Sequence, residues 1–229
     1  PDMAYDLLVR ARDKGLTPYG ISFHVGSQQR DIGQWNDAIA KTKYLMTSLE
    51  EEEDIKLQII NMGGGFPASY IEEANDLSAY ASEITRYLRV DFGDDIPHVV
   101  LEPGRSLVGD AGILVTEVVL TSRKNNTALY RWVYCDTGKF NGLIETLGES
   151  IKYPIVTRND TSDKKTGDVI LAGPTCDSMD IMYEDYKYRL PLDLKVGDRL
   201  YWLSAGAYTS SYASVEFNGF PPIQTYFVE

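Results

Sequence analysis

Three short polar motifs could take part in chemistry, and each follows directly on an apolar run that predicts a strand. They are His24-Val25-Gly26-Ser27, Gly63-Gly64-Gly65-Phe66-Pro67 and Glu102-Pro103-Gly104-Arg105. They supply an imidazole ring, a backbone cradle for an anion, and a carboxylate beside a guanidinium. α/β proteins place such groups at strand ends, because a rigid strand aims a loop that is free to vary. Together the motifs predict a site for a phosphorylated aromatic cofactor.

Each motif also has an ordinary structural explanation when it is taken alone. Successive glycines let backbone N–H groups surround an anion, and a following helix would add its dipole, but a tight turn also needs glycine. Glu102 and Arg105 could face a ring nitrogen and a phosphate, or could simply form an ion pair. His24 could stack on a flat ring or serve as a structural residue. The combination, rather than any single motif, favours the cofactor site.

A polar loop in the second half of the chain adds a thiol. It runs Gly173-Pro174-Thr175-Cys176-Asp177-Ser178-Met179-Asp180 after an apolar strand. A thiol between small and acidic residues can donate a proton or act as a nucleophile, although most free cysteines are buried hydrophobes. This loop is too polar for a core, so the functional interpretation is preferred. Near the end of the chain, the hydroxyl of Tyr208 could reach a phosphate.

The elements that position these motifs differ between the two halves. The first half alternates helical and strand-like patterns with nearly all-apolar strands, which predicts a parallel sheet or barrel. The acidic run Glu50–Asp54 is expected to form a solvated turn after the second helix. The predicted strands are Gly20–Phe23, Leu57–Met62 and Val99–Leu101, and the predicted helices cover Met3–Lys14, the segment capped by Asp31, and Leu77–Leu88.

From about Gly112 the helical period weakens, and short strand-like runs dominate. Many short strands separated by turns predict an antiparallel sandwich or barrel. The boundary is placed near Val108, so the predicted domains are 1–107 and 108–229. The predicted strands are Ile113–Leu120, Tyr130–Tyr134, Tyr153–Val156, Asp168–Leu171, Arg199–Leu203 and Ile223–Phe227, with an exposed loop at Asn159–Gly167.

The composition restricts the partners of the protein. The 229 residues carry a net charge of −12, which argues against a nucleic-acid partner and is compatible with small cationic substrates or with solubility alone. No apolar run approaches the roughly 20 residues that cross a bilayer, and no secretory signal begins the chain. Two cysteines, Cys135 and Cys176, argue against a disulfide framework and favour a cytoplasmic location. No metal site is predicted.

Taken in this order, the motifs resemble those of the fold-III pyridoxal-phosphate-dependent amino-acid decarboxylases of the ornithine, lysine and diaminopimelate group, nearest to the ornithine branch. The resemblance covers nearly the whole chain, and several motifs in register are far more specific than one. It implies part of an alanine-racemase-like β/α (TIM) barrel, followed by a C-terminal β domain of sandwich or Greek-key type. It also implies pyridoxal 5'-phosphate as cofactor, and a homodimer in which the Cys176 loop is offered across the interface.

The resemblance implies a role for each candidate residue. His24 would stack on the pyridine ring of the cofactor, and Glu102 would pair with its nitrogen. The phosphate would be held by Ser27, Gly64, Gly65, Gly104, Arg105 and Tyr208. Cys176 would donate a proton after carbon dioxide leaves. Asp136 and Asp177 would bind the distal ammonium of the substrate, and Phe217 would form a wall of the substrate cavity.

The implied reaction is decarboxylation of ornithine or lysine to putrescine or cadaverine, in polyamine biosynthesis. Two acidic groups would favour the second ammonium of a diamine, because a charge-assisted pair in a dry site is stronger than one in water. In the family, diaminopimelate decarboxylases typically carry glutamate after the cysteine, and Asp177 therefore favours ornithine or lysine. The alternatives are a non-catalytic homologue acting as a binding or regulatory module and, ranked lower, a diaminopimelate decarboxylase or a racemase.

The chain departs from the family pattern at the lysine that anchors the cofactor. The family sets this lysine in a Tyr-Ala-Val-Lys-like strand near the start of the barrel, and no such motif occurs here. Only three of eight expected barrel strands are found. With about 250 residues for eight units, the five others would take about 150 residues. We therefore expect the lysine on an N-terminal segment of the same protein that is absent from this chain.

Overall fold

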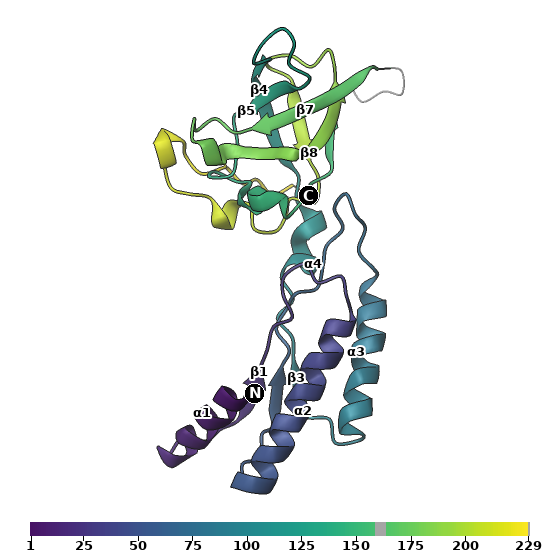
Figure 1. Ribbon diagram of the computed structural model, residues 1–229, viewed down its shortest axis with the longest axis vertical. Helices are drawn as coiled ribbons and strands as arrows, with labels where there is room; N and C mark the ends of the chain where they lie inside the picture. The colour runs from purple at the N-terminus through teal and green to yellow at the C-terminus, as the bar shows by residue number, and fades with distance from the viewer. Residues whose placement is uncertain (159–163, 229) are drawn as a thin grey trace. The chain divides into compact units, whose positions relative to one another are not determined.

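The computed structural model describes residues 1–158 and 164–228, and the chain forms two compact units (Figure 1). The first unit comprises Pro1–Ala68 and Ala74–Leu107, and the second comprises Ser69–Glu73 and the chain from Val108 onward. The sequence prediction placed all of 1–107 in the first domain, so Ser69–Glu73 is a correction. Its physical reason is aromatic packing, since the ring of Tyr70 lies edge-on to Tyr153 with centroids 5.5 Å apart.

The first unit contains a three-stranded parallel sheet. Its strands are β1 (Gly20–Ser22), β2 (Ile59–Asn61) and β3 (His98–Val100), in that order across the sheet. Ile59 is paired with both Gly20 and His98. Parallel neighbours need crossover connections, and the intervening helices supply them. The arrangement confirms the predicted β/α alternation and is consistent with part of a barrel.

Four helices belong to this half of the chain: α1 (Asp2–Asp13), α2 (Gly33–Glu53), α3 (Leu77–Phe92) and the single turn α4 (Arg105–Val108). The acidic run after Leu49 is not a turn, as was expected, but the last turn of α2. Glutamate is a good helix former, and Arg12 of α1 donates to both the carbonyl and the carboxylate of Glu53 (2.7 and 2.9 Å). The helix ends at Glu53, and the next residue, Asp54, adopts a left-handed conformation with φ 54°.

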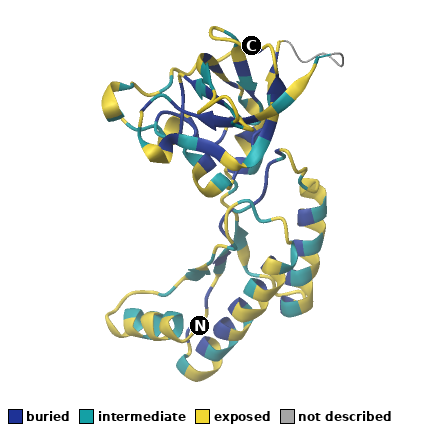
Figure 2. Cartoon of the chain, turned by 45° about the horizontal axis from the view of Figure 1, so that its top comes forward, coloured by how far each residue is buried: buried dark blue, intermediate teal, exposed yellow. Residues whose placement is uncertain are grey.

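One face each of α2 and α3 is buried against the sheet, as Figure 2 shows by colour. The centre of this core is aromatic: the indole of Trp35 lies 5.1 Å from the ring of Phe66 and 5.7 Å from that of Tyr80. Phe66 directly follows the triple glycine, so the core fixes one end of that loop. Further core residues are Ile39 and Leu49 of α2, Ile60 of β2, and Ile84 and Leu88 of α3.

The second unit contains a six-stranded sheet of order β6-β9-β4-β5-β7-β8. Its pairs are antiparallel except β5 with β7, which are parallel, so the prediction of a purely antiparallel sheet is wrong at that pair. The sandwich or Greek-key designation stays a prediction. The strands are β4 (Leu114–Ser122), β5 (Arg131–Cys135), β6 (Ile155–Thr157), β7 (Thr166–Ala172), β8 (Ile181–Pro191) and β9 (Arg199–Trp202).

Two strand predictions in this unit need correction. The long strand β8 was not expected, whereas Ile223–Phe227, expected as a strand, forms none. Ile223 is partly buried beside Gly142, but Phe227 is 98% exposed, so the end of this segment is not packed against the unit. The predicted loop Asn159–Gly167 falls in part on 159–163, outside the described residues, and its last residues already belong to β7. None of the described helices combines the length and the apolar character needed to cross a membrane.

Candidate functional site

The three motifs of the first unit meet beyond the ends of β1, β2 and β3. The N–H of Glu102 donates to the carbonyl oxygen of Gly63 (2.8 Å), which joins the third motif to the second. The N–H of Gln29 donates to the carbonyl oxygen of Gly65 (2.8 Å), which joins the second to the loop after His24. Backbone contacts therefore hold all three motifs together, independently of any ligand.

This close approach depends on glycine. A Cβ on Gly64 would lie 2.5 Å from the carbonyl oxygen of Glu102, and a Cβ on Gly65 would overlap the carbonyl oxygen of Gly26. Gly65 also has φ +91°, a conformation that residues with a side chain rarely adopt. The glycines thus serve loop packing as well as any approach to an anion.

The N–H groups of the triple glycine differ in what they contact. That of Gly63 donates to the side-chain oxygen of Asn61 (2.9 Å), so it is occupied. Those of Gly64 and Gly65 donate to no residue that the structure describes. The expected helix dipole is absent, because α3 begins only at Leu77, well beyond the loop. The predicted anion cradle therefore reduces to two donors.

The ring of His24 lies against this loop. Its Nδ1 accepts the N–H of Gly26 (2.9 Å), so in the neutral ring the proton is on Nε2. A Cβ on Gly63 would come within 3.0 Å of Cδ2 of the imidazole. The hydrogen bond and the bare glycine fix the orientation of a ring that remains exposed to solvent.

A buried cation lies beside a hydroxyl in the same cluster. Arg105 is the first residue of α4 and is only 5% exposed, and its Nη2 donates to Oγ of Ser27 (3.1 Å). Gly104, directly before it, is exposed. A positive charge that is held in place next to a hydroxyl suits a phosphate group.

The carboxylate of Glu102 has a partner that sequence reasoning missed. Nδ2 of Asn61 donates to Oε1 of Glu102 (2.8 Å), while Oδ1 of the same amide accepts from Gly63. Asn61 is the last residue of β2, directly before the glycine motif. The position of Asn61 at a strand end was the one signal in the sequence that could have indicated a role in the site. Its partner Glu102 lies 41 positions away, so the sequence alone does not show the contact.

In the second unit, the loops that carry Asp136, Cys176 and Phe217 are joined to one another. The ring of Phe217 stacks on Phe140 with centroids 4.1 Å apart, and Nδ2 of Asn218 donates to the carbonyl oxygen of Thr175 (2.9 Å). The structure therefore brings the predicted substrate-facing residues of this unit onto one set of connected loops.

The acidic and thiol groups on these loops are accessible to different degrees. Cys176 is exposed and has φ 53°, and Asp177 caps the next turn by accepting the N–H of Met179 (2.8 Å). The exposed Asp136 accepts the N–H of Glu117 (2.9 Å). Cys135 is buried, and burial raises the pKa of its thiol to about 12. Cys176 is the thiol that can react.

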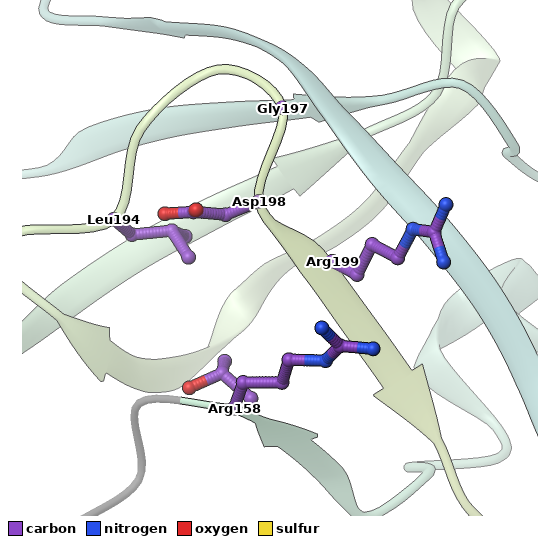
Figure 3. Close-up of a pocket in the computed structure, with 6 residues that line it drawn as sticks. Arg158, Leu194, Gly197, Asp198 and Arg199 are labelled. Carbon is purple, nitrogen blue, oxygen red and sulfur yellow. The ribbon is translucent and has the colours of Figure 1, made fainter.

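Tyr208 belongs to the second unit and has φ 56°, with its ring 5.4 Å from that of Tyr212. Its contact with a phosphate stays a prediction. A separate pocket in this unit contains none of the candidate residues; it is lined by Thr157, Arg158, Leu194, Gly197, Asp198 and Arg199 (Figure 3). Within the described residues, no group of His, Cys, Asp and Glu side chains is arranged to hold a metal ion.

The comparisons with known proteins all find similarity to decarboxylases. Residues 3–109 match the family model described as pyridoxal-dependent decarboxylase, pyridoxal binding domain. The lysine/ornithine decarboxylase of Selenomonas ruminantium is 33% identical over 218 residues, which is 95% of this chain and 52% of that protein. The diaminopimelate decarboxylase of Staphylococcus aureus is 33% identical over 210 residues, 89% of this chain and 47% of that protein.

A solved structure is also similar. The lysine/ornithine decarboxylase of Vibrio vulnificus, complexed with cadaverine, superposes with a TM-score of 0.86 at 29% identity, over 99% of this chain and 59% of that one. The present chain spans about half the length of the curated relatives it matches.

Proposed function

Because the chain belongs to the family of pyridoxal-dependent decarboxylases, we propose that it forms part of an enzyme that decarboxylates a basic amino acid, ornithine or lysine, to a diamine. The observation that carries this proposal is the cluster in the first unit. Loops joined by backbone hydrogen bonds carry four kinds of group. These are the buried Arg105 with the hydroxyl of Ser27, the N–H groups of Gly64 and Gly65, the exposed imidazole of His24, and the carboxylate of Glu102.

This donor set fits pyridoxal phosphate. Arg105, Ser27 and the N–H groups of Gly64 and Gly65 would bind the phosphate, with Gly104 and Tyr208 as further candidates. His24 would face the ring, and Glu102 would hold a proton on the ring nitrogen. When bound, pyridoxal phosphate supplies an electron sink for the carbon–carbon bond that breaks. The protein supplies orientation and charge.

The connected loops of the second unit carry the groups that would act on the substrate. Cys176 would deliver the proton on its Sγ to the carbon that has lost carbon dioxide, and Asp136 and Asp177 would bind the distal ammonium. Phe217, stacked on Phe140, would give the cavity an apolar wall. The chain spans about half the length of the curated relatives it matches, and the complete enzyme would include a further segment with the cofactor lysine. The proposed active form is a homodimer.

The direct test is a side-by-side assay of the complete protein with ornithine, lysine, arginine and diaminopimelate, measuring carbon dioxide and amine. We expect release from ornithine or lysine. Preference for diaminopimelate, which the Staphylococcus aureus relative makes a specific second candidate, would replace the proposed substrate. Binding of pyridoxal phosphate without turnover of any of the four would favour the non-catalytic homologue.

A matched pair of variants tests the role of the thiol. Cys176→Ala should lower turnover by about a hundredfold or more while cofactor absorbance persists, since a positioned acid typically contributes 10² to 10⁴. Cys135→Ala changes the buried cysteine and serves as the control. Unchanged turnover in Cys176→Ala would remove Cys176 from the mechanism.

A further inference from the structure

A buried carboxylate lies at the centre of the connected loops of the second unit. Asp180 is the last residue of the short turn Ser178–Asp180, directly before β8, and it is 2% exposed. Its Oδ1 accepts the N–H of Lys139 (2.7 Å). Its Oδ2 accepts both the N–H (3.1 Å) and the hydroxyl (2.7 Å) of Thr175. The carboxylate thus bonds two loops that are far apart in the sequence.

Two glycines make this arrangement possible. A Cβ on either Gly138 or Gly173 would overlap the carboxylate of Asp180, so both backbones pass directly against it. The N–H of Gly173 also donates to the carbonyl oxygen of Asp180 (2.7 Å). Space for this side chain exists only because both neighbours lack one, which indicates that the three segments are fitted to each other.

The bonded atoms are adjacent to the proposed chemical groups. Thr175 directly precedes Cys176, and Lys139 follows Asp136 in the same loop. The carbonyl oxygen of Thr175 in turn accepts from Asn218, next to Phe217. Asp180 therefore sits between the segments that carry the proposed proton donor, a proposed substrate-binding acid and the proposed apolar wall.

We infer that Asp180 is a positioning residue that fixes Cys176 relative to Asp136; the inference deepens the proposed function and rests on it. A carboxylate suits this role because it accepts several short bonds at once, and bonds to a charged group are the stronger ones. Its removal would leave three buried donors without an acceptor. Cys176 itself has a left-handed backbone, a conformation that persists only where the surroundings determine it.

The test compares Asp180→Asn with Asp185→Asn in the complete holoprotein. Asp185 is an exposed residue of β8, so its variant makes the same chemical change on the strand that directly follows Asp180. An asparagine at position 180 keeps the shape of the side chain. Its NH₂ group would replace one acceptor oxygen, so the bonds to either Lys139 or Thr175 would be lost. The first measurement is the alkylation rate of Cys176 by iodoacetamide without substrate, and the second is kcat and KM for ornithine and lysine. Both are taken well below the melting temperature of each variant.

We expect Asp180→Asn to change the alkylation rate severalfold and to lower kcat by about tenfold to a hundredfold, because small misplacements of a reacting group are costly. Asp185→Asn should change neither. Unaltered alkylation, kcat and KM in folded Asp180→Asn would overturn the inference, even if its melting temperature fell, because that is the signature of a purely structural residue.

A second variant covers the case in which Asp180→Asn does not fold. Thr175→Val removes only the hydroxyl bond and nearly keeps the volume of the side chain, so we expect a smaller effect in the same direction. Thr175→Ser retains the hydroxyl and should behave like the wild type. Wild-type kinetics in Thr175→Val would count against the inference. If the wild type decarboxylates none of the four amino acids, the proposed function fails, yet the alkylation rates still decide the positioning role.

Discussion

Asn61 and Glu102 are joined by a hydrogen bond of 2.8 Å, from the amide nitrogen of one to the carboxylate of the other. The same amide accepts the N–H of Gly63 through its oxygen (2.9 Å). The side chain of Asn61 therefore orients Glu102, which would face the cofactor nitrogen. It also fixes the glycine loop that would bind the phosphate. The two halves of the proposed cofactor site are not independent.

Asn61→Ala should weaken binding of pyridoxal phosphate. The bond is exposed and lies within the protein, so only part of its free energy contributes to cofactor binding, and the dissociation constant should rise severalfold. Titration followed by cofactor absorbance measures it. Asn36→Ala, an exposed asparagine on α2, is the control. Equal dissociation constants for both variants would show that Asn61 does not support the site.

Gly64→Ala should destabilise the first unit through a steric clash alone. Its Cβ would lie 2.5 Å from the carbonyl oxygen of Glu102, and backbone cannot move as a flexible side chain can. Gly93→Ala is the complementary control, because Gly93 has φ +63° but nothing within 4 Å of its Cβ. We expect Gly64→Ala to cost more than the roughly 1 kcal/mol typical of strain at a glycine. Chemical denaturation measures both, and an equal or smaller cost for Gly64→Ala would contradict the close packing of the motifs.

Glu149 should make the second unit sensitive to acid. Its carboxylate accepts three backbone N–H groups from β8, those of Glu184, Asp185 and Tyr186, each at 2.7 Å. Burial opposes its ionisation, but these bonds outweigh burial and hold the pKa of Glu149 below its ordinary value. Because its pKa is lowered in the folded state, ionised Glu149 stabilises the fold at any pH above the ordinary pKa of glutamate. This contribution is lost as the pH falls through the folded-state pKa.

Glu149→Gln should therefore melt at a lower temperature than the wild type at pH 7, and the difference should shrink toward pH 3. Thermal unfolding at several pH values measures this. A difference that is constant across the pH range would show that the charge of Glu149 is not the stabilising feature.

The two cysteines should differ sharply in reactivity. Burial raises the pKa of Cys135 to about 12, so it is almost entirely protonated at pH 8, whereas Cys176 is exposed. Iodoacetamide should modify Cys176 alone in the folded protein, as mapped by peptide mass. Urea should make Cys135 equally reactive. Comparable labelling of Cys135 in the folded state would contradict its burial.

Local patterns predicted the parts of the fold that are locally determined. The strands before His24, Gly63 and Glu102 are apolar and flanked by helices, and they were found within two residues. Tyrosines and charges alternate along part of β8, which is typical of a strand, but two consecutive acids, Glu184 and Asp185, interrupt the alternation. Its pairing with β7 also shifts register next to Leu171, so the pattern is not regular enough to predict the strand. The backbone N–H groups around that irregularity are satisfied by Glu149, a residue more than 30 positions away.

The same limit explains the missed site residues. Asn61 acts on Glu102, and Asp180 acts on Lys139, each across 41 positions. A single asparagine or aspartate carries no signal of such a partner until the strands are in register. The burial of Lys139, which lowers the pKa of its ammonium against the charges of Asp180 and Glu149, likewise follows from packing and not from its neighbours in sequence.

The central claim is that the loops of the first unit bind pyridoxal phosphate through Arg105, and equilibrium titration with the cofactor tests it most directly. Wild type, Arg105→Gln and the exposed control Arg89→Gln would be compared in the complete protein, after circular dichroism shows that all three are folded. The account predicts saturable binding in wild type and Arg89→Gln, and at least tenfold weaker binding in Arg105→Gln, as loss of a charge-assisted contact requires. Indistinguishable affinities for all three, or no binding by the wild type, would contradict it.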